Sequence, residues 1–197
     1  MADDIALLGG FRQPVFDAQA TFRLLMTAMA QPGSRHVVTA EVSAPDGLGL
    51  ARTALVLTLV DADAPVWLAA PTPRLAAWLA FHTGARLVAD AADAAFALVD
   101  RGAALPAGLS RGTQDYPDRS ATLVLEVGGF GHGDTLQLEG PGIDGRRTLA
   151  VAGLPAGFAE LVETNRTLFP LGLDVVLTAG AELCALPRST RVVFSEG

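Results

Sequence analysis

The stretch FPLGLDVVLTAGAELCALPRSTR, residues 169–191, decides the fold of this chain. It opens with a turn in which Pro170 fixes one backbone dihedral angle and Gly172 frees the next. Asp174 is thereby presented at a defined point before an apolar run, and a second apolar run follows at 183–186. This pattern predicts two buried strands joined as a hairpin.

A polar cluster follows the second of these runs. Pro187 ends the strand and brings Arg188, Ser189 and Thr190 together. A guanidinium group and two hydroxyls suit the oxygens of a phosphate, so these three residues are candidates for an anion site. The alternative is structural, because an arginine that follows a strand often pairs with a carboxylate, here that of Asp174. Both interpretations stay open at this stage.

The composition is that of a globular protein with few charges. Of the 197 residues, 50% are hydrophobic and 18% are charged, whereas an average globular domain has about 25% charged residues. The length favours one domain over residues 1–197, with 1–13 as a loosely ordered N-terminal segment. The shortage of charge predicts that a partner covers part of the surface. No apolar run approaches the roughly 18 residues that span a bilayer, so no membrane contact is expected.

The sign and type of the charges exclude several classes of function. A net charge of −7 argues against nucleic acid as a partner, since binding a phosphate backbone needs a basic face. All 14 basic residues are arginine, which excludes the lysine aldimine of pyridoxal phosphate enzymes and the lysine of a Walker phosphate loop. The N-terminus carries Asp3 and Asp4 where a signal peptide needs basic residues, and this predicts a cytoplasmic protein.

Helical and strand patterns interleave along the chain. Helices are predicted at 17–31, 48–59, 73–84 and 158–167. Strands are predicted at 35–42, 66–69, 87–88, 95–99, 121–127, 135–139, 175–178, 183–186 and 192–194. The glycine-rich segment 128–134 is predicted to join its two flanking strands as a hairpin. This order predicts a single-domain three-layer α/β/α sandwich whose sheet is mixed because of the C-terminal hairpins.

The first predicted helix has Asp17 as its N-terminal cap. Four apolar side chains recur along it at helical spacing and are predicted to face the core. They are Phe22, Leu25, Met26 and Met29.

The other reactive side chains do not form a recognisable site. His36, His82 and His132 fall on different predicted elements, and with one cysteine the zinc templates fail, so neither a metal nor a cofactor is expected. His82, at the end of a predicted helix, is the best histidine for the anion site, although bonding the terminal helix carbonyls is its more ordinary role. Cys184 lies in an apolar run and is expected to be a buried thiol. No catalytic residue is assigned.

Short motifs recur in order over nearly the whole chain. They are Asp17-Ala18-Gln19 with Phe22-Arg23, Ala28-Met29 and Pro32-Gly33; Leu57-Thr58-Leu59 with Asp61 and 65–68; Phe81-His82-Thr83; Gly112-Thr113; 140–143; Phe169-Pro170-Leu171-Gly172 with Asp174; and 186–190. Each segment alone is weak, but all of them in register are specific. Together they resemble the PhnH family, the H subunit of the bacterial carbon–phosphorus lyase system.

The resemblance implies a role in phosphonate catabolism during phosphate starvation. Members of the family act with the G, I and L subunits in transferring the ribose triphosphate of ATP onto methylphosphonate, with release of adenine. The resemblance also implies a core assembly with the G, I and J subunits, a homodimer, and ATP or phosphonate bound only within the complex. The implied fold is similar to the large domain of pyridoxal phosphate-dependent transferases, without that cofactor.

Two functions of different classes therefore have to be compared. The first is a subunit without independent catalysis that supports the phosphonate reaction through its partners. The second is an autonomous small-molecule or nucleotide-phosphate binding protein, or an enzyme, whose anion site uses Arg188, Ser189, Thr190 and His82.

Overall fold

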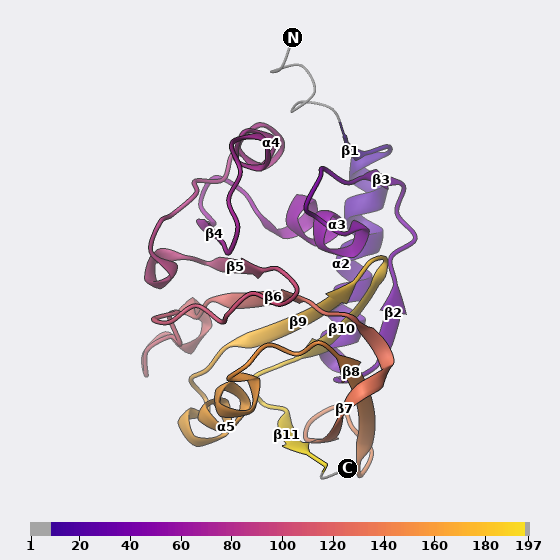
Figure 1. Ribbon diagram of the computed structural model, residues 1–197, viewed down its shortest axis with the longest axis vertical. Helices are drawn as coiled ribbons and strands as arrows, with labels where there is room; N and C mark the ends of the chain where they lie inside the picture. Colours follow the sequence, from indigo (N-terminus) through magenta and orange to yellow (C-terminus); the bar gives the residue numbers. More distant parts are fainter. Residues whose placement is uncertain (1–8, 196–197) are drawn as a thin grey trace.

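The computed structural model describes residues 9–195, in which the main element is a six-stranded mixed sheet (Figure 1). Its strands, in spatial order, are β2 (Arg35–Val37), β10 (Glu182–Leu186), β9 (Asp174–Ala179), β6 (Thr122–Glu126), β5 (Phe96–Val99) and β4 (Val66–Leu68). Strands β4, β5, β6 and β9 are parallel, whereas β10 and β2 run antiparallel to their neighbours. The predicted α/β class, the mixed sheet and the C-terminal hairpin are confirmed.

Two layers cover the faces of this sheet (Figure 1). One face carries α2 (Pro14–Ala30), α3 (Leu50–Leu59) and α4 (Pro73–Thr83). The other carries α5 (Phe158–Leu168) and a three-stranded antiparallel sheet of β11 (Arg191–Phe194), β7 (Gly129–Glu139) and β8 (Arg147–Ala152). The short strands β1 (Gly10–Phe11) and β3 (Val42–Ser43) pair with each other, and two 3-10 turns are η1 (Ala91–Asp93) and η2 (Pro117–Arg119).

Alternation along the central strands divides the apolar interior into two cores. In β6, Val124 packs into the core beneath α2, α3 and α4, while Leu123 and Leu125 pack into the core beneath α5. In β10, Leu183 and Cys184 alternate in the same way. Because successive strand residues point to opposite faces, a strand covered on both sides must be apolar throughout. This explains the continuous apolar runs in the sequence.

The glycine-rich segment 128–134 does not form the predicted hairpin. Strand β6 stays in the six-stranded sheet, whereas β7 begins at Gly129 and pairs with β8, with an irregular register between Phe130 and Asp134. Gly133 has a φ of +90°, and a Cβ there would lie 2.5 Å from the Val151 carbonyl oxygen. The glycines therefore serve an irregular strand that approaches its neighbour closely, and sequence periodicity cannot distinguish this from a turn.

Other predicted strands also differ from the observed ones in their bounds or in the sheet to which they belong. The predicted strand 35–42 divides into β2 and β3, which lie in separate sheets, and 192–194 belongs to the three-stranded sheet. Segment 87–88 makes only a single bridge, between Leu87 and Val66. Of the predicted loose segment 1–13, residues 1–8 lie outside the described residues, and Gly10–Phe11 form β1.

Helix α2 begins three residues earlier than predicted. Pro14 occupies its first turn, and Asp17 accepts a hydrogen bond from the Gln13 backbone N–H at 2.8 Å, so the carboxylate caps the helix from within. The predicted core face is also partly wrong. Leu25 is buried, but Phe22 and Met26 are 48% and 53% exposed, because they lie further around the helix from the sheet.

No helix within residues 9–195 is both long and apolar enough to cross a membrane.

The thiol of Cys184 is expected to be inert in the folded protein. Burial in β10 raises the pKa of this thiol to about 12, and only the thiolate form reacts. At mildly alkaline pH we therefore expect Ellman's reagent to label the native protein far more slowly than protein unfolded in guanidinium chloride. Complete labelling of the native protein at the unfolded rate would contradict this burial.

Candidate functional site

The hairpin of β9 and β10 is held by an ion pair between Asp174 and Arg188. The guanidinium donates from Nε to Oδ1 at 3.2 Å and from Nη2 to Oδ2 at 2.6 Å, and the Arg188 backbone N–H donates to Oδ1 at 2.9 Å. Further donors reach the Ser120 hydroxyl and the Pro117 carbonyl. The two paired side chains are only 15% and 21% exposed. The structural alternative for Arg188, pairing with Asp174, is confirmed.

The two hydroxyl residues of the predicted anion site belong to the turn after β10. The Thr190 backbone N–H donates to the Pro187 carbonyl at 2.8 Å, and the Thr190 side chain is buried. Ser189 is half-buried, and a Cβ at Gly140 would lie 3.0 Å from its carbonyl oxygen. The hydroxyl of Thr190 has no hydrogen-bond partner in the described residues. These contacts fix the turn against the three-stranded sheet.

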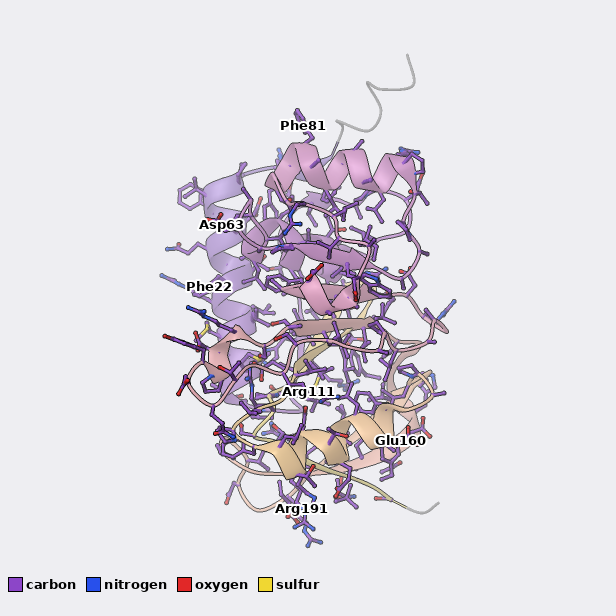
Figure 2. The ribbon with its side chains drawn as sticks, turned by 90° about the vertical axis from the view of Figure 1, so that its left-hand side faces the viewer. Phe22, Asp63, Phe81, Arg111, Glu160 and Arg191 are labelled. Carbon is purple, nitrogen blue, oxygen red and sulfur yellow. The ribbon has the colours of Figure 1, made fainter. Side chains whose placement is uncertain are left out.

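His82 belongs to a different part of the molecule. It lies on α4, where its ring centroid is 4.7 Å from that of Trp78 and 5.0 Å from that of Phe81. Figure 2 shows Phe81 at one end of the molecule and Arg191, which follows the turn of Arg188, at the other. The structure therefore does not bring His82 to the other three residues. Anion binding by this set of residues stays a prediction.

A second polar group lies at the carboxyl ends of β5, β6 and β9, and sequence reasoning missed it. Its centre is Arg52, in the first turn of α3 and only 2% exposed. Nη2 of Arg52 donates to Asp100 Oδ1 and to the Gly47 carbonyl, each at 2.7 Å, and Nη1 donates to the Val99 carbonyl at 3.3 Å. Nε lies 3.8 Å from Glu126 Oε2. The signal was a single charged residue, an arginine, within a mostly apolar helix.

Glu126 connects this polar group to the start of α3. Its Oε2 accepts from the Thr178 hydroxyl at 2.7 Å, and its Oε1 accepts from the Gly180 backbone N–H at 3.2 Å. A Cβ at Gly49, the cap of α3, would lie only 3.0 Å from Oε1. A helix N-terminus attracts anions, and here the chain's own carboxylate lies beside it.

These groups line an open crevice of about 500 Å³. The carboxyl edge of a parallel sheet is where α/β proteins commonly bind ligands. In this crevice, however, the charge of Arg52 is balanced by Asp100 and Glu126, and the donors and acceptors are largely used by one another. Within residues 9–195, no group of three His, Cys, Asp or Glu side chains is placed to hold a metal ion. The charged side chains of this group therefore neutralise one another, and we call the group the Arg52 junction.

Comparison with known proteins agrees with the motifs along the chain. The model of the family described as bacterial phosphonate metabolism protein (PhnH) matches residues 9–193. The chain belongs to the PhnH family. It is 43% identical to the α-D-ribose 1-methylphosphonate 5-triphosphate synthase subunit PhnH of Rhizobium meliloti (strain 1021), over 93% of this chain and 94% of that protein. It is 35% identical to the putative C-P lyase subunit protein HtxG of Stutzerimonas stutzeri, over 88% and 85%.

Replacing Arg52 by Met should destabilise the PhnH fold strongly. The substitution leaves Glu126, which is 18% exposed, without its cation and removes the hydrogen bonds of the buried guanidinium, which costs about 2–3 kcal/mol. Chemical denaturation of the purified chain measures this loss as a fall in the free energy of unfolding.

The matched control is Arg74→Met. Arg74 pairs with Asp46 at the surface, where the side chains are 49% and 85% exposed, so its replacement should cost less than about 1 kcal/mol. Equal losses in the two variants would show that the Arg52 junction contributes nothing special to stability.

Proposed function

We propose that this chain is a subunit, without catalysis of its own, of a carbon–phosphorus lyase system that degrades phosphonates. The observation that carries the proposal is family membership over residues 9–193, together with the names of both relatives. The reaction that it supports is transfer of the ribose triphosphate of ATP onto methylphosphonate, which releases adenine and forms the product named in the Rhizobium meliloti relative. The reaction takes place in the cytoplasm.

The internal use of the polar groups supports a role without independent catalysis. The guanidinium of Arg188 is held by Asp174, and that of Arg52 by Asp100 and Glu126. The thiol of Cys184 is buried and its pKa is raised, so it is a poor nucleophile. Groups of this kind stabilise a fold, and the chemistry then depends on residues that partner subunits supply.

An exposed apolar face on α2 supports a role in assembly. The α2 face, as we name it, consists of Val15, Phe16, Phe22 and Met26, which are 77%, 69%, 48% and 53% exposed. They lie on the side of the helix turned away from buried Ala28, and Figure 2 shows Phe22 at the edge of the molecule. Clustered large apolar side chains on a surface mark protein contacts. We assign the α2 face to contacts within the assembly.

The proposed partners are the G, I and J subunits in a core assembly, with the L subunit required for the reaction. In the absence of these partners, the proposed state of the chain is a homodimer. The reacting ATP and methylphosphonate are brought together only in the assembled complex.

Reconstitution tests the subunit role. Purified chain with ATP and methylphosphonate should release no adenine, whereas a mixture with the G, I and L subunits should, and leaving this chain out should abolish the release. Chromatographic measurement of adenine distinguishes these cases. Adenine release by the chain alone, at the rate of the complete mixture, would contradict the proposal.

Polar substitution of the α2 face tests the assembly surface. The double variant Phe22→Ser and Met26→Ser should keep its thermal midpoint, since both side chains are exposed, but should lose at least tenfold in affinity for its partner chains. Sedimentation velocity and pull-down with the G, I and J subunits measure this.

The matched control is Phe81→Ser, because Phe81 is 60% exposed but belongs to α4 and not to the α2 face, and Figure 2 shows it at one end of the molecule, apart from Phe22. It should assemble normally. Unchanged assembly of the double variant would rule out the α2 face.

A further inference from the structure

A cavity of about 390 Å³ lies between α5 and the loop 105–111, away from the junction at Arg52. Its walls include the start of α5 and the small side chains of the loop. Its floor is a group of leucines that belong to β6, α5, the loop and the turn before β9. They are Leu105, Leu109, Leu123, Leu161 and Leu173. Most of the side chains that line the cavity are apolar and a few are polar, a combination that small-molecule sites often show.

Arg111 is the cation of this cavity. Its Nη1 lies 3.5 Å from Asn165 Oδ1, which is a long contact, and no ion pair joins it to a carboxylate within residues 9–195. An unpaired guanidinium beside an apolar floor has donors free for an anionic ligand. Arg111 differs in this from Arg52 and Arg188, whose guanidinium groups are held by carboxylates.

The position of Arg111 is fixed by the turn that opens the stretch 169–191. The Gly172 backbone N–H donates to the Arg111 carbonyl at 3.1 Å. Asn165, 3% exposed, holds both the N–H and the carbonyl of Leu173, at 2.9 and 2.8 Å. A Cβ at Gly172, where φ is +146°, would lie 2.8 Å from Asn165 Oδ1. The glycine therefore allows the clamp that places Arg111 beside the cavity.

Glu160 supplies an anion at the other end. It lies in the first turn of α5, is exposed, and lines the cavity with Thr164. Arg111 contacts Asn165, which is five residues further along the same helix than Glu160, a rise of about 7–8 Å between the two helix positions. Figure 2 shows both residues beside α5. A cation and an anion thus line the cavity at different levels along α5.

We propose that this cavity binds a short zwitterion, with a phosphonate or carboxylate group on Arg111 and an ammonium group on Glu160. The short carbon chain between the two groups lies on the leucine floor. A ligand with an anionic group but no ammonium group binds less tightly, because it leaves the Glu160 carboxylate without a cation beside a second negative charge. The site goes beyond the proposed subunit function and does not depend on it.

Calorimetric titration of the full chain tests the site with three probes. 2-Aminoethylphosphonate and β-alanine represent the phosphonate and carboxylate forms of the zwitterion, and methylphosphonate carries the anion alone. We expect saturable binding of at least one zwitterion with one site per chain, and at least tenfold weaker binding of methylphosphonate. Absence of saturable binding by both zwitterions would overturn the proposal, as would equal binding of methylphosphonate.

Two variants locate the binding. Arg111→Gln and Glu160→Gln should each lower the affinity for the zwitterion at least tenfold, because each removes a charge-assisted contact. Glu163→Gln is the matched control, since Glu163 lies on the same helix, pairs with Arg166 and does not line the cavity. Glu160 is exposed, so its variant should fold even where that of Arg111 does not. Unchanged affinity in Glu160→Gln, or an equal loss in Glu163→Gln, would overturn the proposed ammonium site.

Discussion

The ion pair between Asp174 and Arg188 holds together the part of the molecule on which the rest is built. Asp174 begins β9 and lies in register with Thr122 at the start of β6, while Arg188 follows the end of β10. Through its remaining donors, Arg188 also reaches Pro117 and Ser120, just before β6. One guanidinium therefore connects a hairpin and the neighbouring parallel strand at the same edge of the sheet, where an unpaired charge would be costly.

A second arginine held by carboxylates connects several elements at the other ends of the parallel strands. Arg52 joins the ends of β5 and β6 to the start of α3, and Glu126 lies against that helix cap. At both edges the chain satisfies its own charges, while the α2 face remains apolar and exposed. This combination, a sheet fixed at its edges and an apolar outer face, suits a protein that acts through assembly with other subunits. Arg111 differs from Arg52 and Arg188, because its guanidinium is not held by a carboxylate in the described part of the chain.

Much of this fold was predictable from local sequence signals. Helices α3, α4 and α5 and the hairpin of β9 and β10 follow from apolar periodicity bounded by proline and glycine, and the pairing of Arg188 with Asp174 follows from their places at strand ends. The irregular strand β7 was not predictable, since glycines permit both a turn and a bulge. The exposure of Phe22 and Met26 depends on which side of α2 meets the sheet. Tertiary placement also decides that Arg52 has partners at the ends of two strands, which lie far from it in the sequence.

A double-mutant cycle tests most directly the claim that the Asp174–Arg188 pair is a structural contact. It needs the unfolding free energies of the native chain, Asp174→Asn, Arg188→Met and the double variant, obtained by chemical denaturation. The account predicts a coupling energy of about 2–3 kcal/mol, because each single variant leaves a partly buried charge without its partner. A coupling energy below about 0.5 kcal/mol, with each variant as stable as the native chain, would contradict it.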